Sequence, residues 1–148
     1  MSKTFTRRRR VEFRDTDMAR IVHFSVFFAY MEETEHELLR SLGLGVICDV
    51  DGQTVSFPRV NAQCDYRSAI RFEEEVDIEL SIARIGTKSI TWNYRFTRED
   101  THVADGSITT VCCIMDHHSR EPKRPEPVAI PDEIVEKLKP YLAAPAAE

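Results

Sequence analysis

One segment, residues 25–43, limits what this chain can fold into more than any other. At about 100° per residue, one set of mostly apolar side chains falls in a single arc of a helix, and most charged side chains fall outside it. The residues in the arc are Phe27, Phe28, Tyr30, Met31, Thr34, Leu38, Leu39 and Leu42. Ser25 is a good N-cap residue, and Gly43 readily takes the left-handed conformation that ends a helix. The sequence therefore predicts one long helix that packs along one face.

Most of the remaining chain reads as strands, chiefly because apolar and polar residues alternate along it. The expected strands are residues 4–14, 58–66, 75–83, 90–96 and 107–115, the last being apolar or small on both faces like a central strand. The later segment PDEIVEKLKPYL predicts a short amphipathic helix. Together these elements predict a single α+β domain over residues 1–148, with one helix on an antiparallel sheet of about five strands.

Composition argues against several classes of function. The net charge of −5 disfavours a general nucleic-acid binder. Within and beyond the arginine run 7–10, Arg8, Arg10 and Arg14 would share the solvent face of an extended strand, where basic residues discourage pairing at a sheet edge. No apolar run approaches the roughly 18 residues of a membrane helix. No secretory signal follows the basic start, so we expect a cytoplasmic protein. The four cysteines lack CxxC spacing, which predicts buried free thiols rather than a zinc or redox site.

Two carboxylates, Asp15 and Asp17, lie just upstream of the expected helix. A helix N-terminus offers free N–H groups and partial positive charge, so a carboxylate beside it has an oxyanion site within reach. Both residues are also common turn formers, and this alternative stays open. An Asp-x-Asp pair suits metal-dependent phosphoryl or glycosyl transfer too, but the chain is short and has no glycine-rich phosphate loop. We therefore expect no metal and no cofactor.

Other polar residues are candidates for binding or for structure. His23 precedes the helix and is a pocket residue, a general base or a structural histidine. Glu35 projects into the apolar arc and Glu32 lies on its border. Because a buried carboxylate is costly, we expect one of the two to meet a partner, a neighbouring subunit or a substrate, unless the helix is rotated enough to solvate both. His117 and His118 would point to opposite sides of an extended chain, which predicts a turn rather than a metal site.

Two segments together resemble a known family. DTDMARIVHFSVFFAYMEE is similar to the opening of the 4-hydroxybenzoyl-CoA thioesterase-like branch of the hotdog fold. FPRVNAQCDYRSAIRFEEEVDIELSIARIGTKSI is similar to the second and third strands of that branch. The resemblance implies a sheet wrapped around a central helix. It also implies homodimers, often paired into homotetramers, with active sites at the subunit interface.

The resemblance also assigns roles to individual residues. Asp17 matches the catalytic carboxylate, the Phe24 backbone N–H matches the donor that polarises the thioester carbonyl, and Glu32 matches a position that contacts the acyl group. Arg20 stands where glycine is usual, and its cation either lowers the basicity of Asp17 or reaches a phosphate of CoA. Val26 stands where asparagine is usual, which removes one polar contact at the start of the helix.

These residues predict an acyl-CoA thioesterase that releases a free acid and CoA. We expect the substrate to contact His23 and Arg20 as well, in an acyl pocket bordered by Phe24, Phe27 and Tyr30. An aliphatic and an aromatic acyl group both stay open, as do the roles of base and nucleophile for the catalytic carboxylate. The alternative is a non-catalytic hotdog module that binds acyl-CoA or an acyl carrier protein.

Overall fold

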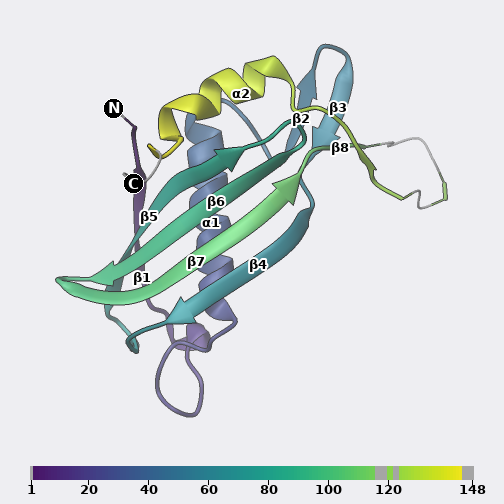
Figure 1. The fold of residues 1–148 in the computed structure, drawn as a ribbon. Helices are drawn as coiled ribbons and strands as arrows, with labels where there is room; N and C mark the ends of the chain where they lie inside the picture. Colours follow the sequence, from purple (N-terminus) through teal and green to yellow (C-terminus); the bar gives the residue numbers. More distant parts are fainter. Residues whose placement is uncertain (1, 116–119, 122–123, 145–148) are drawn as a thin grey trace.

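The main sheet has five antiparallel strands in the order β1-β5-β6-β7-β4. The computed structural model describes residues 2–115, 120–121 and 124–144. The strands are β1 (Phe5–Arg10), β5 (Glu75–Ile85), β6 (Ser89–Arg98), β7 (Thr101–Val111) and β4 (Arg59–Tyr66). Helix α1 (Val26–Ser41) lies along one face of this sheet, behind it in Figure 1. The predicted α+β architecture is thus confirmed.

A smaller layer covers the C-terminal end of α1. It is a four-stranded sheet in the order β2-β3-β8-β9, followed by a short helix (Figure 1). Its elements are β2 (Ile47–Val50), β3 (Gln53–Ser56), β8 (Cys113–Ile114), β9 (Glu126–Pro127), α2 (Asp132–Leu138) and the 3-10 turn η2 (Lys139–Tyr141). The sequence predicted α2 but not β2. No helix in the described ranges is long and apolar enough to cross a membrane.

The core forms where the alternating strands meet the apolar arc of α1. Residues Val76, Ile78, Leu80 and Ile82 of β5 are fully buried, as their alternation predicted. The helix packs tightly on Gly106 in β7, where a side chain would collide with the buried Met31. The absence of a side chain at Gly106 therefore leaves the space that Met31 fills.

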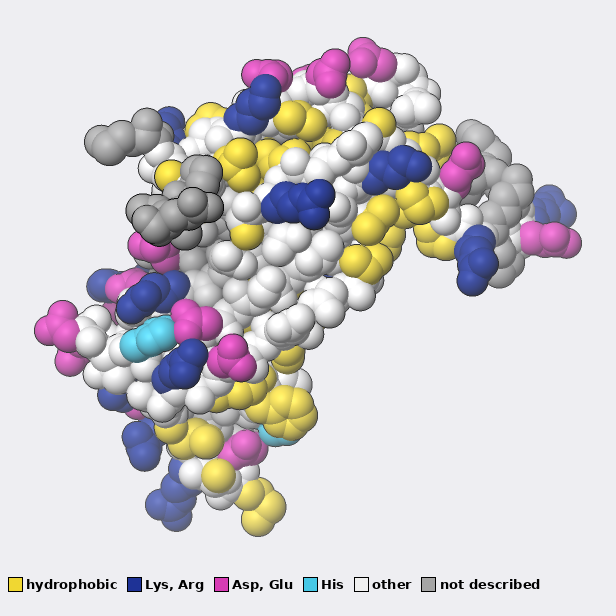
Figure 2. All heavy atoms as spheres, in the orientation of Figure 1, with side chains coloured by type: hydrophobic (Ala, Val, Ile, Leu, Met, Phe, Trp, Pro, Cys, Tyr) yellow, Lys and Arg dark blue, Asp and Glu magenta, His cyan; other side chains and the backbone are white. Residues whose placement is uncertain are grey.

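Strand β4 differs from its prediction in a way that matters for the site. The sequence predicted a half-buried strand, but Val60 is 61% exposed and Tyr66 is 45% exposed. Tyr66 opposes the buried Ala104 of β7 and faces the helix side of the sheet, where its ring lies 5.0 Å from that of Phe27, yet α1 covers it only in part. The surface of the molecule shows hydrophobic side chains at both ends of this strand (Figure 2). An edge strand has no neighbour on one side, and local alternation does not reveal this position.

Two other boundaries also differ. The first strand ends at Arg10 rather than near residue 14, because residues Phe13–Asp15 form a 3-10 turn, η1. The expected strand 107–115 breaks at Cys112, where the chain leaves the main sheet for the smaller one. Helix α1 ends as predicted, with Gly43 at φ +72°.

Candidate active site

Asp17 lies in a tight loop between η1 and the start of α1. The loop is closed by two backbone hydrogen bonds, from Asp17 N to Ile21 O at 3.0 Å and from Arg20 N to Asp17 O at 2.9 Å. Ala19 N donates to Asp17 Oδ1 at 2.8 Å, which fixes the orientation of the carboxylate. The side chain stays partly exposed. Asp17 is therefore oriented and open to a substrate or a water molecule.

Arg20 has a left-handed backbone, with φ +64°, at the position where the resemblance has glycine. This conformation costs a residue with a Cβ roughly 1–2 kcal/mol. The side chain is exposed. A cation is thus held beside the Asp17 loop at an energetic cost to the fold.

Phe24 lies where the chain enters α1 and is 63% exposed. Its backbone N–H has no hydrogen-bond partner in the part of the chain that the structure describes. Its carbonyl accepts a hydrogen bond from Tyr66 OH, 2.7 Å away at the end of β4. The Phe24 N–H is therefore available to a ligand, while the Phe24 carbonyl is hydrogen-bonded to the sheet.

The sequence predicted that the Ser25 side chain caps α1, but in the structure it does not. Ser25 has helical backbone angles and no side-chain capping bond, and its Oγ lies 2.6 Å from His23 Nδ1. Ser25 N also donates to His23 Nδ1, at 3.3 Å. The His23 imidazole thus takes over part of the capping. Its ring lies 4.6 Å from that of Phe24, so the two predicted site residues are adjacent.

Tyr66 is a site neighbour that the sequence did not indicate. Burial, and then the neighbouring Cys64, raise the pKa of Tyr66 to about 12. Its hydroxyl therefore keeps its proton and donates to Phe24 O throughout the physiological pH range. The two residues are 42 positions apart, and no spacing rule connects them.

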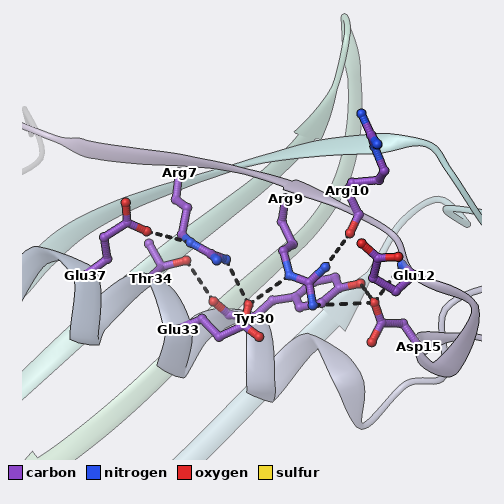
Figure 3. A network of polar contacts seen from close by, with 9 residues as sticks. All are labelled: Arg7, Arg9, Arg10, Glu12, Asp15, Tyr30, Glu33, Thr34 and Glu37. Atoms are coloured by element: carbon purple, nitrogen blue, oxygen red, sulfur yellow. Dashed lines mark hydrogen bonds and ion pairs between the residues drawn. The ribbon is translucent and has the colours of Figure 1, made fainter.

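Asp15 and Asp17 lie in opposite environments although they are two residues apart. Asp15 is 7% exposed and faces α1, where Tyr30 OH donates to Asp15 Oδ2 at 2.7 Å (Figure 3). Tyr30 is 1% exposed and Phe27 is 3% exposed, and both belong to the hydrophobic core. In a single chain, only Phe24 of the three aromatic residues expected to border an acyl pocket reaches the surface.

A separate apolar cavity of about 230 Å³ lies at the C-terminal half of α1. It lies between α1, β6, α2 and the chain segments around β2 and the start of β4, and its walls include Leu39, Phe57, Trp92 and Leu138. Glu32, Glu35, His36 and Arg59 are the charged or titratable groups that line it. The cavity combines apolar walls with a polar patch, the usual make-up of a small-molecule site.

Glu35 finds its partner within its own chain. It is 4% exposed, and Arg59 Nη1 lies 2.7 Å from Glu35 Oε2. Burial raises the pKa of Glu35 above its usual value, and the charge of Arg59 opposes this shift. Glu32 is more exposed, and its Oε1 lies 3.8 Å from His36 Nε2. The sequence left open what the two glutamates contact. In the structure Glu35 pairs with a residue of its own chain, and Glu32 faces the cavity.

Within one copy of the chain, the cavity and the Asp17 loop lie toward opposite ends of α1. From Val26 to Leu39, α1 rises by roughly 20 Å, at 1.5 Å per residue. Strand β4 spans the same distance in the opposite direction, from Arg59 at the cavity to Tyr66 at Phe24. The loop and the cavity therefore do not form a single pocket in one chain.

The structure shows no metal site among the residues it describes, since no three histidine, cysteine or acidic side chains there could hold an ion. The predicted turn at His117 and His118 lies outside the described residues. The cysteines are free. Three of them, Cys48, Cys112 and Cys113, are buried, as expected.

The sequence profile of the thioesterase superfamily matches residues 19–104. A protein of Aquifex aeolicus (strain VF5) is 32% identical over 137 residues, which cover 91% of this chain and 98% of that protein. The 1,4-dihydroxy-2-naphthoyl-CoA hydrolase of Nostoc punctiforme is 29% identical over 136 residues, which cover 92% of this chain and 87% of the hydrolase.

Solved structures show the same fold. A 1,4-dihydroxy-2-naphthoyl-CoA thioesterase from Synechocystis superposes with a TM-score of 0.78 at 19% identity, covering 93% of this chain and 96% of its own. A gentisyl-coenzyme A thioesterase superposes with a TM-score of 0.75 at 25% identity, covering 90% of this chain and 98% of its own.

Proposed function

This chain belongs to the thioesterase superfamily, and from that membership we propose that it hydrolyses an acyl-CoA with Asp17 and the Phe24 N–H as its catalytic groups. The predicted hotdog fold is confirmed by the likeness to solved thioesterases. The observation that carries the assignment is a free backbone N–H at the start of α1, in the same loop system as an oriented, partly exposed carboxylate.

The chemistry follows from these two groups. An oxygen of water, or of Asp17 itself, attacks the thioester carbon, and the Phe24 N–H stabilises the negative charge that develops on the carbonyl oxygen. The C–S bond then breaks, and the sulfur of CoA takes up a proton. With Asp17 as base, this proton comes from the attacking water. With Asp17 as nucleophile, a mixed anhydride forms first, and a water molecule then cleaves it to the free acid and the Asp17 carboxylate and supplies the proton. Oxygen-18 label in the Asp17 carboxylate after a single turnover would identify the nucleophilic route.

The proposed site uses two copies of the chain. A two-fold axis at the middle of the free β4 edge would pair two β4 strands antiparallel, with Tyr66 of one copy near Arg59 of the other. The Asp17 loop of one copy would then lie near the cavity of its partner. The exposed, uncovered residues of β4 support this arrangement. Light scattering at micromolar concentration should give a dimer or tetramer, and an active monomer would contradict the two-chain site.

We propose that the cavity takes the acyl group and that this group is aromatic and hydroxylated. Relatives that act on 1,4-dihydroxy-2-naphthoyl-CoA support the class. The cavity supports it as well, because apolar walls suit a ring, and the carboxylates of Glu32 and Glu35 suit a hydroxyl donor. His23 lies on the Asp17 side and would border the thioester, whereas Phe27 is buried in the core behind this surface. Arg20 would meet the phosphates of CoA.

The test is Asp17→Asn in a panel of aromatic and aliphatic acyl-CoA thioesters, followed with a thiol-reactive dye. The amide keeps the shape but loses basicity and nucleophilicity, so kcat should fall by roughly 10²–10⁴. Asp100→Asn, in the exposed turn between β6 and β7, is the matched control and should leave kcat unchanged. If wild type hydrolyses none of the panel but binds acyl-CoA or an acyl carrier protein, the chain is the non-catalytic module instead.

A further inference from the structure

A cluster of charged and aromatic groups joins β1, η1 and the first turns of α1 (Figure 3). At its centre, Oδ2 of the buried Asp15 carboxylate accepts hydrogen bonds from Tyr30 OH at 2.7 Å and Glu12 N at 2.9 Å, and it forms an ion pair with Arg9 Nη2 at 3.7 Å. Burial, and then the hydrogen bond to Asp15, raise the pKa of Tyr30 far above its usual value. Tyr30 is therefore a permanent donor to Asp15.

Arg9 holds this pair from the strand side. Its guanidinium carbon lies 5.0 Å from the centre of the Tyr30 ring, and its Nε lies 3.1 Å from Glu33 Oε2. Glu33 also accepts a hydrogen bond from Arg7 Nη1 at 2.8 Å. The arginine side chain is 13% exposed, so solvent weakens these contacts less than at the surface. The cluster thus fixes the start of α1 against β1.

Asp15 connects the cluster to both proposed catalytic groups. Its backbone oxygen accepts a hydrogen bond from His23 N at 2.9 Å, and His23 directly precedes Phe24. Thr16, the next residue after Asp15, forms a bridge with Val22, and this bridge closes the loop that carries Asp17. The Asp17 loop and the start of α1 therefore share one anchor.

We propose that Tyr30, Asp15 and Arg9 are the positioning residues of this active site. They hold the Asp17 carboxylate and the Phe24 N–H at the separation that the reaction requires, without touching the substrate. The inference rests on the proposed thioesterase mechanism. The sequence left open whether Asp15 is only a turn former, and a turn former would need neither burial nor a tyrosine from the helix.

Tyr30→Phe tests this role, because it removes the hydroxyl and keeps the ring. A misplacement of about 1 Å costs up to about a hundredfold in rate, so kcat should fall about tenfold to a hundredfold while KM stays within about twofold. The His23 amide hydrogen should also exchange faster, because its acceptor, the Asp15 backbone oxygen, belongs to a residue that Tyr30 no longer holds in place. Tyr141→Phe is the control, because the structure shows no hydrogen bond to the Tyr141 hydroxyl within the described ranges.

A double mutant separates positioning from general stability. If Tyr30 positions Asp17 together with the Phe24 N–H, then Tyr30→Phe should lower the residual kcat of Asp17→Asn by a clearly smaller factor than it lowers the kcat of wild type. Equal factors in both backgrounds, or a wild-type kcat in Tyr30→Phe, would overturn the positioning role. Should Tyr30→Phe fail to fold, Arg9→Lys keeps the charge, loses the planar fork and must show the same loss of kcat. A wild-type protein without thioesterase activity would instead overturn the proposed function itself, and this assignment with it.

Discussion

Replacing Gly106 with alanine tests how closely α1 packs on the sheet. A Cβ at this position would lie 2.2 Å from Met31 Cε and 2.7 Å from Met31 Sδ. Favourable contacts between such atoms need about 3.5–4.0 Å, so Met31 must retreat by more than about 1 Å. Met31 is fully buried and has no exposed surface toward which to move. Overpacking of this kind costs about 1–3 kcal/mol, and we expect the free energy of unfolding to fall by that amount.

Urea unfolding, followed by the fluorescence of the buried Trp92, measures this loss. Met31→Ala supplies the decisive comparison, because the shortened side chain leaves space for the new methyl group. The cost of Gly106→Ala should then shrink to below about 0.5 kcal/mol. A cost that is the same in both backgrounds, or an alanine variant as stable as wild type, would refute the close approach of α1 at this point.

Two more predictions follow from the charged residues. The pKa of Glu35 is higher in the folded than in the unfolded protein, where it has its usual value of 4.5. Above pH 4.5 the folded protein therefore binds more protons at Glu35 than the unfolded protein does. The resulting contribution of Glu35 to stability is lost as the pH rises through the folded-state pKa. Glu35→Gln should remove this pH dependence from urea midpoints measured between pH 4 and 8, and an unchanged dependence would assign it to other groups. Arg20→Gly should raise KM for acyl-CoA about tenfold, the effect of losing roughly 1.4 kcal/mol of binding. KM for an acyl-pantetheine thioester, which lacks the nucleotide phosphates, should stay the same, and equal changes for both substrates would exclude the phosphate contact.

Local periodicity predicted most of the fold, because the helix and the central strands each bury one face along their length. The arc from Phe27 to Leu39 and the alternation of β5 depend only on residues close in sequence. The same alternation gave a wrong prediction of burial at β4. It marks which side chains face inward, but not how far a helix covers them. The strand β2 was missed because it is only four residues long and lies in a turn-rich segment.

The candidate site could be predicted only in part, for a related reason. The resemblance named Asp17 and Phe24, whose roles depend on a loop and a helix start that are contiguous in sequence. The supporting contacts join distant positions: Tyr30 with Asp15 and Tyr66 with Phe24. Such pairs are set by how helix and strand pack, so no spacing in the sequence reveals them.

The uncovered edge of β4 has a kinetic consequence. If two β4 edges pair as proposed, completing an active site is a bimolecular step, and its rate depends on the product of two chain concentrations. A freshly diluted or newly refolded sample would then show a lag before steady hydrolysis, and the lag would shorten as the protein concentration rises. In a cell, the amount of this chain would set how fast catalysis begins as well as how much of it there is.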